Sequence, residues 1–174
     1  MQGFINPEEI LNQLKLKEDM IAADFGSGSG GWAIPLAKIL KEGKVYAIDV
    51  LEEALSALKG KTEISKTFNI IPIRSNIEED KGSKIQSNHA DLVLLTNLLF
   101  EVEDKTLVFF EANRVLKKGG KILVVDWKEA SPIGPKEGRI SAKDVVELAQ
   151  DLDLKQIKEF KAGNYHYCLL FEKP

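Results

Sequence analysis

The chain of 174 residues has little cysteine and histidine, the residues from which disulfides and most zinc sites are made. It contains one cysteine, Cys168, so no disulfide can form within the chain. That cysteine and the two histidines, His89 and His166, do not have the spacing of a zinc site. No apolar run approaches the roughly 18 residues that a membrane-spanning helix needs. We therefore expect no bound metal and no membrane span.

The N-terminus lacks a basic segment followed by a long apolar stretch, so we expect no signal peptide. Together with the lone cysteine, this favours a cytoplasmic protein. The net charge is -3, and acidic residues interleave with the lysines, which gives no electrostatic reason to expect nucleic acid as a partner. The length suggests about one domain, and 44% hydrophobic residues can supply its core.

The most informative stretch is DFGSGSGG, from Asp24 to Gly31. It follows the short apolar run at residues 20–23 and precedes an apolar-periodic segment that starts near Trp32. A strand, a glycine turn and a helix in this order hold nucleotide-like ligands, because glycine lets the backbone approach closely and the first N–H groups of the helix face the ligand. Asp49 ends the next apolar run, at the spacing expected for a carboxylate that binds a ribose.

Apolar runs and amphipathic segments alternate along the chain, which predicts a doubly wound, parallel α/β sheet with helices on both faces. After a first helix that begins at Asn6-Pro7, we expect helices at about residues 31–41, 52–60, 104–116 and 141–150. Strands are expected at about residues 20–25, 44–50, 68–75, 90–96, 121–127, 154–162 and 165–173.

Three turn-forming or strand-breaking features refine this prediction. Pro72 favours an edge position for its strand. Gly119-Gly120 is expected to stop the helix that precedes it. Gly163-Asn164 predicts a tight hairpin turn, which makes the last strand antiparallel.

The glycine stretch satisfies two ligand patterns at once. Gly26, Gly28 and Gly31 match the G-x-G-x-x-G of NAD-binding proteins. Asp24, with glycines at 26, 28 and 30, matches the acidic-x-G-x-G-x-G pattern of class I S-adenosylmethionine-dependent methyltransferases. A charged residue near the end of a buried strand is costly unless it has a task. Asp24 and the antiparallel terminal hairpin therefore favour the methyltransferase interpretation.

From end to end, the chain resembles a class I methyltransferase. It is most similar to the ubiquinone/menaquinone-biosynthesis-type and arsenite-methyltransferase-like branch. The resemblance covers about residues 7–174 and rests on DFGSGSGG, AID, ADLVLLTNLLFEV, RVLKKGGKILVVDW and YHYCLLFEK. It implies one methyltransferase domain over residues 1–174, with residues 1–19 as an N-terminal helix and candidate lid. The implied Rossmann-like sheet has seven strands in the order 3-2-1-4-5-7-6, with strand 7 antiparallel.

The resemblance also implies S-adenosylmethionine as the cofactor and a set of residues that bind it. The expected cofactor-binding residues are Asp24, Gly26, Ser27, Gly28, Gly30, Asp49, Val50, Leu51, Asn76, Ile77, Asn97 and Leu98. Within this set, Asp49 would bind the ribose, and the residues around 50 and 76 would flank the adenine. The family often has aspartate where Asn76 stands, so we expect a weaker or shifted adenine contact there.

Methyl transfer from a sulfonium is a direct displacement, which needs alignment of the reactants more than it needs a nucleophile or a metal. Ligands bind beyond the carboxyl ends of parallel strands. The expected residues on that side are Phe4, Trp32, Trp127 and Tyr165 as substrate contacts and His166 as the candidate general base. Structural roles stay open for several of these residues: a turn histidine for His166, core packing for Trp32, a helix cap for Asp49 and an ordinary loop residue for Asn76.

The predicted reaction is methyl transfer to a small-molecule acceptor of aromatic or amphipathic character. The scarcity of cysteine disfavours arsenic as the acceptor atom. No inserted cap domain is evident, which suggests an open pocket, closure by the N-terminal segment, or a pocket completed by a second subunit, as in a homodimer. One alternative is a cofactor-binding module without turnover. Another is a small NAD-dependent reductase, although the chain lacks the Tyr-x-x-x-Lys pair usual in such enzymes.

Overall fold

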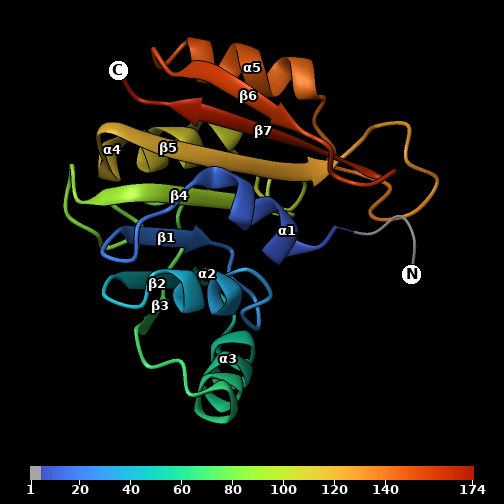
Figure 1. Ribbon diagram of the computed structural model, residues 1–174. Helices are drawn as coiled ribbons and strands as arrows, with labels where there is room; N and C mark the ends of the chain where they lie inside the picture. The colour runs from blue at the N-terminus through green and yellow to red at the C-terminus, as the bar shows by residue number, and fades with distance from the viewer. Residues whose placement is uncertain (1–4) are drawn as a thin grey trace.

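The structure is a computed structural model that describes residues 5–174, and its strands form one mixed sheet in the order β3-β2-β1-β4-β5-β7-β6 (Figure 1). The strands are β1 (Ile21–Phe25), β2 (Lys44–Asp49), β3 (Ile70–Arg74), β4 (Ala90–Thr96), β5 (Leu116–Trp127), β6 (Lys155–Phe160) and β7 (His166–Glu172). The pairings among β1 to β5 are parallel, whereas β7 runs antiparallel to both β5 and β6. The predicted strand order and the antiparallel last strand are confirmed.

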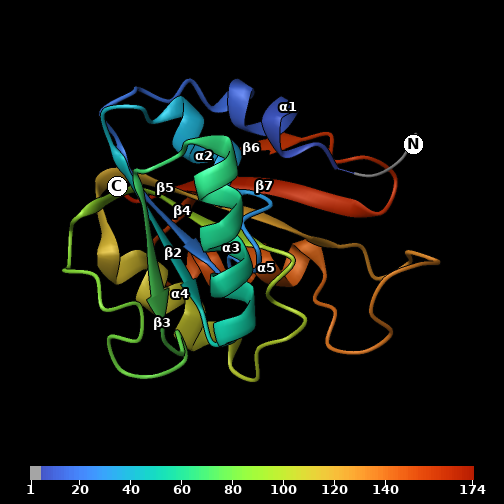
Figure 2. The ribbon, with the colours of Figure 1, turned by 90° about the horizontal axis from the view of Figure 1, so that it is seen from below.

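Helices cover both faces of the sheet, as predicted. They are α1 (Pro7–Leu11), the 3-10 turn η1 (Asn12–Leu14), α2 (Ala33–Ile39), α3 (Glu52–Ser65), α4 (Lys105–Val115) and α5 (Ala142–Gln150). Figure 2 shows α1 and α2 on one face and α4 and α5 on the other. Side chains alternate along β4, so Leu92 and Leu94 belong to the core cluster that includes α1 and α2, whereas Val93 and Leu95 belong to the cluster that includes α4 and α5.

Polar side chains begin three of the helices at positions that the sequence indicates. Asn6 Oδ1 accepts from the Glu8 N–H at the start of α1 (3.1 Å). Asp104 caps α4, and the Ser141 hydroxyl oxygen accepts from the Asp144 N–H at the start of α5 (3.0 Å). These bonds satisfy N–H groups that have no partner inside the helix. No helix within residues 5–174 has both the length and the apolar character needed to cross a membrane.

The expectation that Gly119-Gly120 stops a helix is wrong. α4 ends at Val115, and Leu116 already has extended backbone angles (φ -69°, ψ 136°) and pairs with Ala90 in β4. The pairing resumes only at Lys121 with Leu92, so the intervening residues of β5 bulge out of the ladder. Gly119, at φ +76°, lies in that bulge, where a left-handed conformation favours glycine.

Two other boundaries differ from the prediction. α3 continues through Gly60, because one exposed glycine costs a helix only about 1 kcal/mol. The helix ends at Ser65, and the next residue, Lys66, takes a left-handed conformation (φ 53°). The turn between β6 and β7 spans residues 161–165, so it is wider than the predicted two-residue hairpin. The edge position that Pro72 predicts for β3 is confirmed, since β3 pairs only with β2.

Candidate functional site

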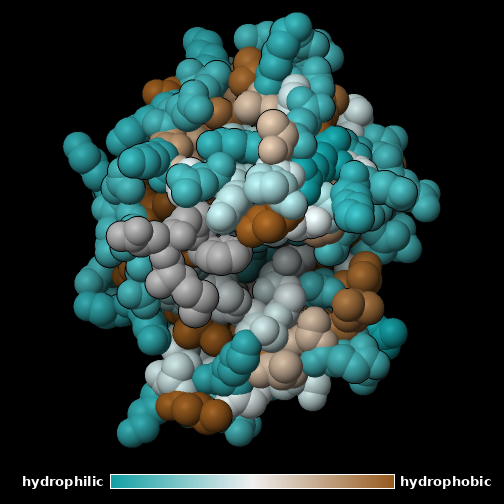
Figure 3. Space-filling model, turned by 90° about the vertical axis from the view of Figure 1, so that its right-hand side faces the viewer, coloured by the Kyte–Doolittle hydropathy of each residue, from teal (hydrophilic) through white to brown (hydrophobic). Residues whose placement is uncertain are grey.

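A pocket of about 500 Å³ opens at the edge where the parallel strands end. Figure 3 looks onto this edge and shows a hollow there. The lining residues are Gly26, Ser27, Gly28, Ser29, Gly31, Trp32, Ile48, Asp49, Val50, Leu51, Ala54, Ser75, Asn76, Ile77, Glu78, Thr96, Asn97, Leu98, Glu101 and Val102. They come from the segments that follow β1, β2, β3 and β4, so the sheet topology gathers residues that lie far apart in the sequence.

The glycines of the loop after β1 have different tasks. Gly28 (φ +52°) faces the pocket, because a Cβ built on it would meet no atom within 4 Å. Gly30 (φ +88°) does not line the pocket; a Cβ there would collide with Leu58 of α3 and press on Ile34 of α2. Gly28 thus keeps the pocket open, and Gly30 allows close packing of the helices behind the loop.

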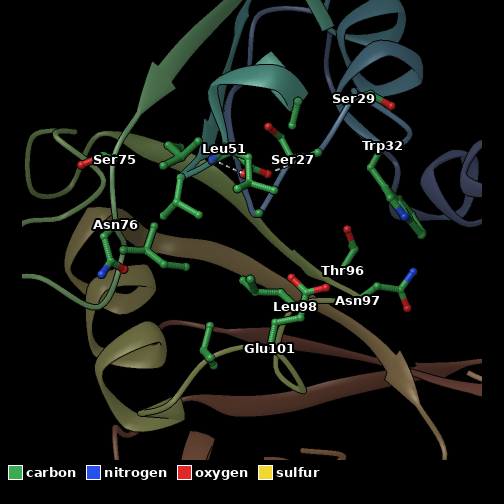
Figure 4. Close-up of a pocket in the computed structure, with 18 of the residues that line it drawn as sticks. Ser27, Ser29, Trp32, Leu51, Ser75, Asn76, Thr96, Asn97, Leu98 and Glu101 are labelled. Carbon is green, nitrogen blue, oxygen red and sulfur yellow. Dashed lines mark hydrogen bonds between the residues drawn. The ribbon is translucent and has the colours of Figure 1, made fainter. Parts of the chain in front are cut away.

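Asp49 joins the two segments that form the upper part of the pocket in Figure 4. Its Oδ2 accepts from the Gly28 N–H (2.8 Å), and its Oδ1 accepts from the Leu51 N–H (2.9 Å). A carboxylate oxygen can accept a further hydrogen bond, so Asp49 keeps capacity for a ligand hydroxyl. The expected ribose-binding acid therefore also fixes the glycine loop and the approach to α3.

Asp24 lies beneath the glycine loop, at 0% exposure, and does not line the pocket. Neither of its carboxylate oxygens has a hydrogen-bond partner within residues 5–174. Burial raises the pKa of Asp24 to about 8, the nearby Ala33 N–H opposes this rise, and the charge of Asp49 adds to it. Such a poorly satisfied acid is expensive, which fits a group placed for function and not for stability.

The loop after β4 forms another wall of the pocket, and Asp126 fixes it from below. Asn97 has a left-handed backbone (φ 51°), and the following Leu98 and Leu99 donate their N–H groups to Asp126 Oδ2 at 3.2 and 2.8 Å. Asp126 Oδ1 also accepts from the Trp127 N–H (2.7 Å). Burial raises the pKa of Asp126 to about 6, although the three hydrogen bonds act in the opposite direction and lower it.

Asn76 and Ile77 both line the pocket after β3, as expected. Asn76 Oδ1, however, accepts from the Glu78 N–H (3.0 Å), which is an Asx turn within the loop. This turn uses one of the two lone pairs of the amide oxygen, so an adenine contact by Asn76 stays a prediction. Ile77 is 6% exposed and supplies an apolar wall on this side of the pocket.

The tentative substrate residues do not all come together. Trp32 lines the pocket, whereas Trp127 and Tyr165 do not. Phe4 lies outside the described residues. His166 is buried at the start of β7 with its ring centroid 4.0 Å from that of Trp127, and it does not line the pocket either. Burial lowers the pKa of His166 to about 4, and the charge of Lys128 adds to the effect, so the ring is neutral at pH 7.

Ten of the twelve expected cofactor-binding residues line the pocket, and Asp24 and Gly30 stand behind it. The sequence analysis missed Thr96, Glu101 and Val102, although they belong to the strand and loop segment ADLVLLTNLLFEV that it singled out. It also missed Asp126, whose role depends on hydrogen bonds from Leu98 and Leu99, which lie 28 and 27 positions earlier in the sequence. An aspartate at the end of an apolar strand was the available indication, as it was for Asp24 and Asp49.

A family model described as a methyltransferase domain matches residues 16–168. The chain belongs to this methyltransferase family. Its pattern of strands, with the antiparallel β7 between β5 and β6, is that of the class I S-adenosylmethionine-dependent methyltransferases. The region matched by the family model includes the whole pocket.

Similar proteins agree with this membership in the methyltransferase family. A demethylmenaquinone methyltransferase of Bacillus cereus (strain ATCC 10987 / NRS 248) is 30% identical over 155 residues, which cover 88% of this chain and 64% of that protein. The chain thus spans slightly under two thirds of the length of this curated relative. A crystal structure of an S-adenosylmethionine-dependent methyltransferase from Aquifex aeolicus is 26% identical, with a TM-score of 0.87 over 97% of this chain and 89% of that one.

A second solved structure is similar over nearly the same span. It is a type 11 methyltransferase from Sulfolobus solfataricus with 27% identity and a TM-score of 0.79, covering 98% of this chain and 93% of that chain. Both crystal structures are similar to this chain over more than nine tenths of its length. The family assignment therefore does not depend on the glycine loop alone.

Proposed function

We propose that this protein transfers a methyl group from S-adenosylmethionine to a small-molecule acceptor. The observation that carries the proposal is the charge of the pocket. Its charged lining residues are Asp49, Glu78 and Glu101, and no lysine, arginine or histidine among residues 5–174 lines it. S-adenosylmethionine carries a positive sulfonium, which such acids attract, whereas the diphosphate of NAD gains no attraction from them. The pocket thus favours the methyltransferase interpretation over the reductase.

The residues present fit the parts of this cofactor. Gly28 leaves room for a ligand against the backbone, and Asp49 has free acceptor capacity for ribose hydroxyls. The exposed side chains of Val50 and Leu51, together with Ile77, would cover the two faces of the adenine. The bound cofactor supplies an activated methyl group, and the walls made by Gly28 and Leu98 would hold it in line with the acceptor and exclude water.

The relatives support an aromatic or amphipathic acceptor, since the curated ones are named demethylmenaquinone methyltransferases. Trp32, Leu98 and Val102 supply the apolar surface that such an acceptor would need. We further propose a cytoplasmic protein that acts as a single domain without nucleic acid. Residues 1–19 would close the pocket, because α1 lies toward the edge where the strands end (Figure 1), or a homodimer would complete it.

A binding module without turnover is the second candidate. It is favoured by the position of His166, the candidate base, outside the pocket lining. It is also favoured by the Asx turn that engages the oxygen of Asn76. Such a module would bind S-adenosylmethionine without transferring its methyl group.

Calorimetric titration with S-adenosylmethionine, S-adenosylhomocysteine and NAD tests the cofactor. We expect the first two to bind and NAD not to bind. Asp49→Ala should weaken binding by about 1–3 kcal/mol, the cost of a lost hydrogen-bonding group in a pocket. Glu53→Ala is the matched control and should bind normally, because Glu53 is an exposed acid in the first turn of α3 that does not line the pocket. Binding of NAD alone would refute the proposal.

Turnover is tested separately with radiolabelled S-adenosylmethionine and a panel of acceptors that includes hydroxylated naphthoquinols. Transfer of label to an acceptor is the expected result, and at cofactor concentrations that do not saturate the site it should be reduced in Asp49→Ala and kept in Glu53→Ala. Binding of the cofactor without transfer to any acceptor in the panel would favour the module over the enzyme.

A further inference from the structure

Glu101 differs from the other acids of the pocket in having no partner for its carboxylate. Asp49 accepts from two backbone N–H groups, and Glu78 Oε1 accepts from the Asp104 N–H (2.7 Å). Within residues 5–174, no hydrogen bond or ion pair involves the Glu101 carboxylate. Figure 4 shows this carboxylate directed into the pocket, toward the glycine loop. Its charge is therefore available to a ligand.

Other acids near the pocket interact electrostatically with Glu101. Burial, and then the negative charge of Asp49, raise the pKa of Glu101. The charge of Glu101 in turn acts on Asp126, adding to the burial that raises the pKa of that residue. Asp49 ends β2, and Asp126 lies near the end of β5. Glu101 lines the pocket together with the glycine loop after β1 and with Asn97 and Leu98 after β4.

An unpaired acid among other acids destabilises an empty pocket, and a cation would relieve that repulsion. The proposed cofactor provides one, because its sulfonium is bonded to the 5′ carbon of the ribose, next to the part that Asp49 would bind. The product of methyl transfer, S-adenosylhomocysteine, has the same adenosine and amino-acid ends but no charge on sulfur.

We propose that Glu101 makes the pocket prefer the charged S-adenosylmethionine to its uncharged product. This inference rests on the proposed function and goes beyond it by assigning discrimination between cofactor and product to one side chain. Loss of the sulfonium charge removes the attraction to Glu101, so this side chain strengthens binding of the cofactor and not binding of the product.

Calorimetric titration of both ligands into the wild-type chain and Glu101→Gln tests the proposal. Glutamine keeps the shape of the side chain and removes its charge. We expect the affinity for S-adenosylmethionine to fall about five- to tenfold, equivalent to about 1–1.4 kcal/mol for a partly exposed charge pair, while the affinity for S-adenosylhomocysteine changes less than about twofold. Glu103→Gln removes the same charge from the same loop outside the pocket lining and should leave the ratio of the two affinities unchanged.

The possible outcomes separate the two proposals. An equal fall for both ligands in Glu101→Gln, or no fall for either, would overturn the role of Glu101 while leaving cofactor binding intact. A change in the ratio for Glu103→Gln as large as that for Glu101→Gln would also overturn it, since the effect would then be a general one of net charge. Failure of the wild-type chain to bind either ligand would overturn the proposed function and, with it, this inference. Both exchanged side chains are exposed, and matching thermal unfolding curves would confirm that the variants fold.

Discussion

Replacement of Asp24 by asparagine should stabilise the protein, and the gain should depend on pH. Asp24 is fully buried, and its oxygens have no hydrogen-bond partner in the described part of the chain. Its pKa rises from 3.8 to about 8 on folding, so the folded protein binds a proton more tightly than the unfolded chain does. Stability therefore falls as pH rises through this window, from the unfolded pKa to the folded one.

The size of the effect follows from the shift. Inside the window, the cost grows by up to about 1.4 kcal/mol per pH unit, so about 3 kcal/mol separates pH 5.5 from pH 7.5. Asparagine has nearly the same shape and no proton to lose, so the variant does not have this cost. In a domain of this size, about 3 kcal/mol corresponds to about 6–12 °C in melting temperature. The advantage of the variant over wild type in melting temperature should therefore be about 6–12 °C larger at pH 7.5 than at pH 5.5.

Thermal and urea unfolding of the wild-type chain and Asp24→Asn at several pH values between 5 and 9 would measure this. Asp19→Asn, an exposed change of the same kind, is the control and should show little difference from wild type at any pH. A difference between Asp24→Asn and wild type that does not vary with pH, or a variant less stable throughout, would refute the reasoning. Either result would mean that the Asp24 carboxylate is ionised and compensated in the folded protein.

Three further changes test the walls of the pocket. Gly28→Val should reduce the affinity for S-adenosylmethionine, measured by calorimetry, more than about 100-fold. The valine side chain would extend into the open pocket from a left-handed backbone position. Retained binding would mean that the loop does not touch the ligand. Asp126→Ala should lower the free energy of unfolding in urea by about 2–4 kcal/mol, because the buried Leu98 and Leu99 N–H groups lose their acceptor; a loss under about 0.5 kcal/mol would contradict this. His166→Phe should bind S-adenosylmethionine within about twofold of wild type, because the ring is buried beside Trp127 and outside the pocket lining; a tenfold loss would place His166 in the site.

The sequence was sufficient for the parts of the fold that depend on local pattern and on chain order. Asn6, Asp104 and Ser141 begin helices where their side chains predict, and Pro72 lies in an edge strand. The strand order required the resemblance to methyltransferases, because the alternation of strands and helices alone does not say which strands are neighbours.

The errors arose where distant contacts override a local pattern. Gly119-Gly120 has the composition of a helix stop, but Leu116 is drawn into pairing with Ala90 before those glycines are reached, and they become a bulge instead. Gly60 also resembles a helix end, yet α3 continues past it for a local reason, because one exposed glycine costs a helix only about 1 kcal/mol.

The site shows the same division. Asp49 and the glycine loop are adjacent to strands and carry recognisable spacing, so they could be placed in advance. Asp126 and Glu101 could not, since the first acts through backbone groups of another loop and the second matters only because no partner neutralises it. For Asn76 a weaker or shifted adenine contact was expected, and its own loop uses the amide oxygen in an Asx turn.

A crystal structure of the protein with S-adenosylhomocysteine would test most directly whether the pocket beyond β1 and β2 holds an adenosyl group. The expected result is a ribose hydrogen-bonded to Asp49, an adenine between Leu51 and Ile77, and a sulfur facing the walls made by Gly28 and Glu101. A nucleoside bound elsewhere on the molecule, or a ribose that makes no contact with Asp49, would contradict the account.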